Sequence, residues 1–284
     1  VYKIFRNGTL IGETRGDTYD DYGLSLGENY TYHVEGYKEG RKIATSESQS
    51  AMPFSPSQDC DVYDNRNGQY LKNREGGISG MKIGDLYFSY RLERKKKTVD
   101  GQEKDGWLLS ESYSTTGKEG SWNSPREIAF YPNVNFEGIG FRYNEKTRKV
   151  VLSAHYEDQG GYTAAKIFLA QITPKGGIEI GTMERPLGHD SRDQSLFVDE
   201  DGTAYLLSAT NMNSDINIYR LDETWTKPVA LANTICKGQH RETPSILKKD
   251  GTYYFFSSKA SGWYPSQTMY ASADRIDGKW SPLK

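Results

Sequence analysis

The chain has 284 residues and a formal net charge of −2, with 29 Gly and 21 Tyr. This length fits one or two domains, and the frequent aromatic residues and glycines favour β structure. The nearly balanced charge argues against a nucleic-acid-binding surface, and no apolar run approaches the length of a membrane span. Two cysteines, Cys60 and Cys236, are too few for a disulfide framework and too far apart in the sequence for a metal knuckle.

The first 54 residues alternate apolar and polar side chains with the period of β-strands, as in VYKIFRNG and NYTYHVEGYK. Asn7-Gly8 predicts a two-residue hairpin turn. The stretch DYGLSLGENYTYHV has the leucine, glycine and spaced tyrosines of a tyrosine corner. Residues 1–54 therefore resemble a fibronectin type III module that begins at about its third strand. We expect an N-terminally incomplete β-sandwich here.

Residues 51–58 contain two prolines and no periodicity, which is typical of a linker. Beyond them, a unit of aromatic strands recurs about every 50 to 60 residues, with hardly any helical pattern. Its four copies contain IGDLYFSY (83–90), TRKVVLSAHY (147–156), EDGTAYLLSA (200–209) and KDGTYYFFSS (249–258). Such a unit is typical of a β-propeller blade, so residues 55–284 are predicted to form a β-propeller. Either the propeller has four blades, or a further blade lies beyond residue 284.

Three copies of the repeat carry a carboxylate at an equivalent place, before the apolar strand that precedes the turn: Glu137, Asp193 and Glu242. Since the inner strands of a propeller run toward its central channel, we expect the three side chains at one end of the channel. A single such carboxylate more often binds backbone amides or an arginine, but three at matching places indicate a functional set. Glycoside hydrolysis needs one carboxyl group held protonated and others that shift its pKa and bind sugar hydroxyls.

The stretches GHDSRDQSLFVDEDGTAYLL, GQHRETPSILKKDGTYYFFSSKASGW and FEGIGFRYNEKTRKVV resemble the five-bladed propeller enzymes of glycoside hydrolase family 43. Within that family they are most similar to the branch of the exo-β-1,3-galactanases, over about residues 75–284. The resemblance implies that Glu242 is the general acid, that Asp193 modulates its pKa and orients it, and that Glu137 contacts the sugar. We expect Asp193 to be ionised beside Arg192 or Arg241.

The sequence departs from most of the family in the first blade, where an Asp usually acts as the base. Here residues 74–80 read REGGISG, and Glu75 is the nearest carboxylate. The galactanase branch also lacks that Asp and is thought to use a Gln of the last blade. That blade is not in this chain, so we assign no base and expect the propeller domain over 55–284 to be C-terminally incomplete.

Other residues flank the carboxylates or match substrate-contacting positions of the branch, and each has ordinary packing as its alternative. The candidates for substrate binding are Trp263, His189, Gln239, His240, Arg192, Tyr162 and Asn211. Trp263, in SGW, is the candidate for a sugar-stacking platform.

The sequence thus predicts an all-β protein, a β-sandwich module followed by a five-bladed-type β-propeller. We expect an inverting exo-glycosidase that removes galactose from β-1,3-galactan or arabinogalactan-type glycans in an extracellular or periplasmic location. The alternatives are a non-catalytic glycan-binding propeller and a family 43 arabinofuranosidase or xylosidase. The expected partner is an oligo- or polysaccharide, with no nucleic acid and no membrane span. No cofactor or catalytic metal is predicted, and a structural cation in the propeller channel is left open.

Overall fold

The chain is built from β-strands, and the one helix among its described residues is the 3₁₀ turn η1 (Pro186–Gly188). The computed structural model describes residues 1–284 apart from 17, 26–27, 53–61, 65–68, 72–76, 119 and 263–265. The chain divides into two units, Val1–Tyr63 with Tyr70–Asn73 and Asp64–Gln69 with Arg74–Lys284. The all-β prediction is confirmed, and no helix in the described ranges is long and apolar enough to cross a membrane.

The first unit contains an antiparallel sheet with the strand order β2-β1-β3-β4, and β5 also pairs with β3. Its strands are β1 (Tyr2–Arg6), β2 (Thr9–Thr14), β3 (Tyr30–Lys38), β4 (Arg41–Thr45) and β5 (Gln49–Ala51). Asn7 and Gly8 form the predicted β1–β2 turn with φ of 50° and 80°. At the start of β3, the Tyr30 hydroxyl accepts a hydrogen bond from the Ser25 amide at 2.9 Å, a contact like that of a tyrosine corner. The strands described within residues 1–54 form a single sheet, so the β-sandwich stays a prediction.

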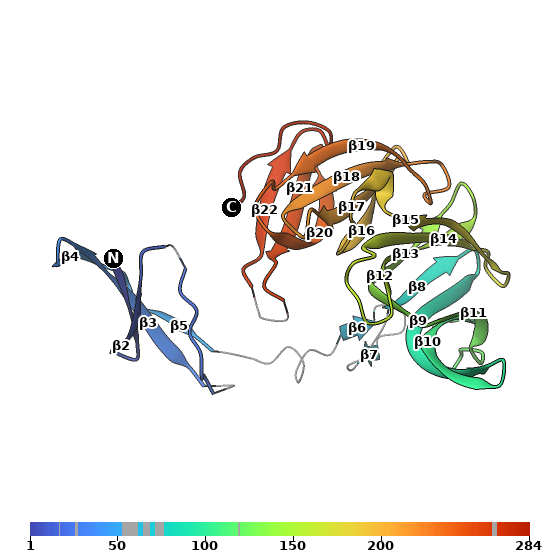
Figure 1. Cartoon of the computed structure of the whole chain (residues 1–284), viewed down its shortest axis with the longest axis horizontal. Coiled ribbons are helices and arrows are strands. Elements are labelled where there is room, and N and C mark those ends of the chain that lie inside the picture. The colour runs from blue at the N-terminus through green and yellow to red at the C-terminus, as the bar shows by residue number, and fades with distance from the viewer. Residues whose placement is uncertain are drawn as a thin grey trace. The chain divides into compact units, whose positions relative to one another are not determined.

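The second unit is a series of antiparallel sheets in which consecutive strands of the chain are neighbours (Figure 1). We number these sheets 1 to 4. Sheet 1 contains β8 (Gly77–Ile83), β9 (Leu86–Val99), β10 (Gln102–Ser114) and β11 (Arg126–Pro132), and sheet 2 contains β12 (Val134–Asn144), β13 (Lys149–Asp158), β14 (Lys166–Ile172) and β15 (Ile178–Glu184). Sheet 3 contains β16 (Gln194–Val198), β17 (Ala204–Thr210), β18 (Asp215–Leu221) and β19 (Pro228–Ile235), and sheet 4 contains β20 (Arg241–Lys249), β21 (Thr252–Lys259) and β22 (Met269–Ala273). Two short strands, β6 (Val62–Asp64) and β7 (Gln69–Leu71), pair with each other, and each is divided between the two units.

Tight turns explain why the strands of one sheet follow the chain. At Asp100-Gly101, between β9 and β10, both residues have positive φ (53° and 76°). At Asp250-Gly251, between β20 and β21, the values are 51° and 79°. Two-residue hairpins of this kind need positive φ at both positions, which Gly and Asp tolerate best. The repeated Gly turns seen in the sequence therefore act as hairpin turns, as predicted.

The sheets pack against one another in chain order, and their apolar residues fill the spaces between them. Leu152 of β13 belongs to the cluster shared with sheet 1, whereas its neighbour Val151 belongs to the cluster shared with sheet 3. Alternate residues of a strand point to opposite faces, so β13 is buried on both sides. Trp225 and Trp280 pack into or against the clusters between sheets. The first strands β8, β12, β16 and β20 contact each other in the same series. This arrangement is consistent with propeller blades, while the five-blade count stays a prediction.

A buried carboxylate links sheet 1 to sheet 2. Glu111 of β10 is only 1% exposed, and its oxygens accept hydrogen bonds from the Tyr90 hydroxyl at 2.9 Å and Arg126 at 3.0 Å. The Lys175 amide, in the turn between β14 and β15, donates to the same carboxylate at 3.0 and 3.1 Å. Arg126 also donates to the Gly176 carbonyl oxygen at 2.7 Å. One buried side chain, Glu111, therefore accepts hydrogen bonds from residues of both sheets.

Replacing Glu111 by Ala should lower the free energy of unfolding by about 3 kcal/mol, because it leaves a buried hydroxyl and a backbone amide without an acceptor. Chemical denaturation followed by tyrosine and tryptophan fluorescence measures the loss. Glu103→Ala is the matched control, since Glu103 lies on the same strand, is 68% exposed in its side chain and pairs only with Lys96 on the surface. Equal stability of the two variants would contradict the assigned role of Glu111.

Candidate active site

The three predicted carboxylates lie at the same end of three neighbouring strands. Glu137 is near the start of β12, Asp193 directly precedes β16, and Glu242 is the second residue of β20. β16 contacts both β12 and β20. The Thr243 amide, one residue past Glu242, donates a hydrogen bond to Asp193 Oδ2 at 3.1 Å. The structure therefore brings the three groups into one electrostatic site.

Bulges in β12 and β20 follow directly after the two glutamates. The ladder register shifts between Glu137 and Gly140 and again between Glu242 and Ser245. The residue after each glutamate has positive φ, 57° at Gly138 and 49° at Thr243. A bulge re-aims the side chains beside it and leaves backbone groups without ladder partners. In both strands the glutamate side chain therefore departs from the regular alternation of side chains between the two faces of the sheet.

Two consecutive residues of β16 supply the missing partners. Gln194 Nε2 donates to the Gly138 carbonyl oxygen in sheet 2 at 2.5 Å. Ser195 Oγ donates to the Pro244 carbonyl oxygen in sheet 4 at 2.6 Å. Sheet 3 therefore fixes the position of both bulges, and with them the two glutamates.

The surroundings of Glu242 raise the pKa of its carboxyl group. Burial raises the pKa of Glu242, and the negative charges of Asp193 and Glu137 raise it further. A hydrogen bond from Asn213 Nδ2 to Glu242 Oε1, at 2.7 Å, acts in the opposite direction without reversing the shift. A carboxyl group whose pKa is raised in this way is suited to donate a proton.

Burial also raises the pKa of Asp193, against the opposing effects of the Thr243 amide and His155. We expected Asp193 to be ionised beside Arg192 or Arg241, but among the described contacts neither arginine forms an ion pair with Asp193. Arg241 is buried and donates to the hydroxyl and carbonyl oxygens of Ser257 and to the Gln267 carbonyl oxygen at 2.6 to 3.0 Å. Both arginines bind backbone carbonyls, so they hold loops in place rather than balancing this charge.

The surroundings of Glu137 lower its pKa, whereas those of Asp193 and Glu242 raise theirs. Tyr162 donates its hydroxyl to Glu137 Oε1, and Asn135 Nδ2 lies 3.5 Å from the same oxygen. His155 Nδ1 lies 3.5 Å from Glu137 Oε2, without the alignment of a hydrogen bond, so this contact is electrostatic. His155 lowers the pKa of Glu137, and Tyr162 adds to this effect against the influence of burial. Glu137 is therefore held as a carboxylate.

His155 is itself held by a buried acid. His155 and Glu157 are 2% and 1% exposed, and His155 Nε2 lies 2.8 Å from Glu157 Oε1. The ring therefore has a fixed orientation, with Nδ1 turned toward Glu137.

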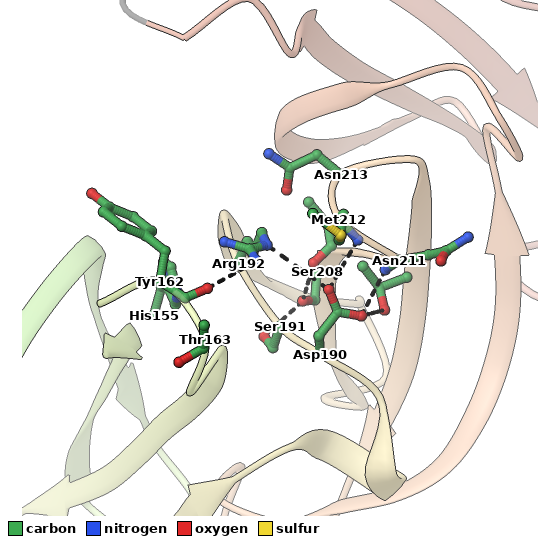
Figure 2. A network of polar contacts seen from close by, with 12 residues as sticks. His155, Tyr162, Thr163, Asp190, Ser191, Arg192, Ser208, Asn211, Met212 and Asn213 are labelled. Atoms are coloured by element: carbon green, nitrogen blue, oxygen red, sulfur yellow. Dashed lines mark hydrogen bonds and ion pairs between the residues drawn. The ribbon is translucent and has the colours of Figure 1, made fainter. Parts of the chain in front are cut away.

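The structure brings some of the other predicted residues to the carboxylates and leaves others apart. Tyr162, 52% exposed, contacts Glu137 as described. Arg192 lies beside it and donates to the Tyr162 carbonyl oxygen at 3.0 Å (Figure 2). Asn211 instead donates its amide to Asp190 at 2.7 Å and turns its side chain toward Asp215. It is therefore a loop-forming residue here.

The remaining candidates make no direct contact with the three carboxylates in the described part of the chain. His189 is exposed, with its ring centroid 6.4 Å from that of Tyr219. Gln239 and His240 are exposed, and their amides donate to the Ser214 carbonyl oxygen at 3.1 and 3.3 Å. Trp263, Glu75 and Cys60 lie outside the described residues.

The sequence patterns missed His155 and Asn213. His155 pairs directly with Glu137 across the β12–β13 ladder, so aligning the two strands from their turn would have found it. Asn213 had a weaker signal, the two asparagines of NMN directly after β17. Asn213 lies far from Glu242 in the sequence and reaches it only through the conformation of its turn.

A pocket of about 550 Å³ lies beside Glu137, since its walls include Asn135 and Tyr162, which both contact that carboxylate. Arg94 and Trp107 form another part of the wall, with the guanidinium 5.5 Å from the indole centroid. This volume suits a small ligand such as a sugar. Another cavity, of about 1200 Å³, lies at the other ends of β12 and β16, and Glu137, Asp193 and Glu242 are not among its lining residues. In the described ranges, no cluster of three or more His, Cys, Asp or Glu is arranged to hold a metal ion.

Replacing Ser195 by Ala should lower the free energy of unfolding by about 1 to 2 kcal/mol, because the Pro244 carbonyl oxygen loses its donor. Urea denaturation measures this loss. Ser195→Thr keeps the hydroxyl and should retain most of the stability. If Thr and Ala were equally destabilising, the hydrogen bond would not be what fixes the β20 bulge.

The sequence was compared with known proteins and structures. Residues 160–284, which include Asp193 and Glu242, match the family model described as glycosyl hydrolases family 43. A search of curated proteins found no match.

The similarity to solved structures covers more of the chain than residues 160–284. The chain is similar to an exo-β-1,3-galactanase from Clostridium thermocellum, with 28% identity, a TM-score of 0.59, and coverage of 76% of this chain and 49% of that one. It is also similar to an exo-β-1,3-galactanase from Phanerochaete chrysosporium in complex with galactose, with 27% identity, a TM-score of 0.60, and coverage of 80% and 52%. This chain spans about half the length of each. The family and both of these neighbours are glycoside hydrolases.

Proposed function

We propose that the family 43 segment and the sheets before it belong to an inverting, exo-acting glycoside hydrolase that releases galactose from β-1,3-galactan or arabinogalactan-type glycans. The observation that carries this proposal is the meeting of Glu137, Asp193 and Glu242 at one end of three neighbouring strands, and the raised pKa of Glu242 and lowered pKa of Glu137 agree with it. The similarity to two exo-β-1,3-galactanases supports galactose over arabinose or xylose as the sugar released.

In this proposal Glu242 is the general acid. Its proton passes to the glycosidic oxygen as the bond between that oxygen and the anomeric carbon breaks, and a water molecule attacks the anomeric carbon from the opposite face. The oxygen of the water remains on the released sugar, whose configuration is thereby inverted, and one proton of the water passes to a general base. Asp193 acts through Glu242, because its nearby negative charge disfavours loss of the acid's proton before substrate arrives.

Glu137 is assigned to sugar binding. As a carboxylate it accepts hydrogen bonds only, so it suits the hydroxyl groups of a sugar. Tyr162 and Asn135, which contact Glu137, also form part of the adjacent pocket. The proposed sugar contact at Glu137 therefore borders this pocket, whose lining does not include the acid Glu242. Because the substrate is a polymer that a cell meets outside its cytoplasm, we also propose an extracellular or periplasmic location.

The full-length protein should release galactose from β-1,3-galactan, and Glu242→Gln should lower kcat by about 10³-fold while the glycan still binds. Reducing-sugar release and isothermal titration measure the two effects, and early ¹H NMR spectra should show the α-anomer first. Binding without release by the wild type would favour a glycan-binding propeller. Release of arabinose or xylose instead would favour another family 43 specificity.

Asp193→Asn should move the basic limb of the kcat/KM–pH profile to lower pH. The basic limb reports deprotonation of the general acid, and removing the Asp193 charge removes a cause that raises the pKa of Glu242. Thr243, whose amide contacts Asp193, should still find an oxygen acceptor in the Asn side chain. An unchanged basic limb with lower activity would mean that Asp193 contributes only to structure.

A further inference from the structure

The turn after β17 has an unusual backbone. Asn211, Met212 and Asn213 have positive φ in succession, at 51°, 53° and 62°. Asn enters this left-handed region more readily than most residues, but a Met there is strained. Met212 is also 77% exposed, so burial of its side chain does not stabilise the conformation. Contacts of the turn's backbone must therefore hold it.

Asp190 makes these contacts. Its Oδ1 accepts hydrogen bonds from the Asn211 amide at 2.7 Å and the Thr210 hydroxyl at 2.9 Å, and its Oδ2 accepts one from the Met212 amide at 3.0 Å (Figure 2). Burial raises the pKa of Asp190, but the hydrogen bonds from Met212 and Asn211 outweigh it, and the net shift is downward. Asp190 is thus a carboxylate that binds two successive amides of the strained turn.

The turn places Asn213 against the proposed acid. Asn213 is the third left-handed residue, and its Nδ2 donates to Glu242 Oε1 at 2.7 Å. The next residue, Ser214, accepts the Gln239 amide at 3.1 Å, which ties the turn to the segment leading into β20. The direction of the Asn213 side chain therefore depends on the backbone that Asp190 holds.

On its other side, Asp190 is linked to the sugar-binding carboxylate. Arg192 Nε lies 3.8 Å from Asp190 Oδ2, and the same guanidinium donates to the Tyr162 carbonyl oxygen. Figure 2 shows Arg192 lying between Tyr162 and Asp190. The Tyr162 hydroxyl in turn contacts Glu137. One carboxylate thus connects the surroundings of Glu137 and Glu242.

We propose that Asp190 is a positioning residue of the active site, which aims Asn213 at Glu242 by fixing the 211–213 turn and holds Tyr162 in place through Arg192. It touches neither the substrate nor the acid. The inference rests on the proposed function, since Glu242 is taken as the acid.

A second aspartate in sheet 3 provides a matched control. Asp222 follows β18 at its opposite end and also binds a turn, accepting the Thr226 and Lys227 amides at 3.1 and 3.2 Å. This turn also contains a left-handed residue, Trp225, with φ of 61°. Asp222 lines the cavity at the end of the strands away from the three carboxylates. A purely structural effect of losing such an aspartate should appear equally at both places.

The test compares Asp190→Asn with Asp222→Asn in the full-length protein. An Asn side chain has one oxygen where Asp has two, so each variant loses an acceptor for its turn. Both should lower the melting temperature. Only Asp190→Asn should lower kcat/KM on β-1,3-galactan, by about tenfold, and move the basic limb of its pH profile to higher pH. The direction follows because the Asn213 hydrogen bond lowers the pKa of Glu242 and is weakened in this variant.

Asn213→Ala should move the basic limb in the same direction, and the double variant Asp190→Asn/Asn213→Ala should move it no further. An unmoved basic limb in Asp190→Asn, or additive shifts in the double variant, would overturn the inference while leaving the proposed function intact. If the wild type releases no sugar, the proposed function fails instead.

A second readout does not depend on activity. The chain has five methionines, so the Met212 methyl signal in ¹³C-methyl NMR spectra can be assigned from a Met212→Leu variant. This signal should shift and sharpen in Asp190→Asn, as the exposed turn gains mobility, and stay unchanged in Asp222→Asn. An unchanged signal in Asp190→Asn would show that Asp190 does not hold the turn.

Discussion

The position of the candidate active site depends on two backbone carbonyl groups. The bulges after Glu137 and Glu242 release the carbonyls of Gly138 and Pro244 from their ladders, and β16 binds both through the side chains of Gln194 and Ser195. Consecutive residues on a strand point to opposite faces, so one short strand can reach both neighbours. These two hydrogen bonds join sheet 3 to sheets 2 and 4. The electrostatic interactions among the three carboxylates depend on the distances between these sheets.

The carboxyl groups at this site have pKa values shifted in different directions because their surroundings differ. Glu137 lies beside a histidine ring and a tyrosine hydroxyl, which lower its pKa, whereas Glu242 is half-buried beside another negative charge, which raises its pKa. Neither arginine acts as a counter-charge to Asp193, so burial is the main cause of the shift in its pKa. Proteins commonly shift the pKa values of two carboxyl groups apart by such differences in surroundings. Here the differences arise between sheets 2 and 4, which carry Glu137 and Glu242 at the same end of their first strands.

The sequence was sufficient to predict the strands, the hairpin turns and the placement of the three carboxylates, because these depend on local periodicity and on Gly or Asp at tight turns. It was not sufficient to predict what surrounds the carboxylates. The sequence led us to expect Arg192 or Arg241 beside an ionised Asp193, but both arginines donate to backbone carbonyls. Asn213 and Asp190 act through a strained turn, whose conformation a sequence of ordinary polar residues does not reveal.

The strand order of the sheets has a consequence for folding. Each of sheets 1 to 4 pairs strands that are consecutive in the chain, so its contacts are local and its contact order is low. The candidate active site depends instead on contacts between residues far apart in the chain. It draws side chains from sheets 2, 3 and 4 and forms only after these sheets have packed together. A fluctuation that separates two sheets would leave every hairpin intact and still dismantle the site. Catalytic competence is therefore expected to be more fragile than secondary structure in this molecule.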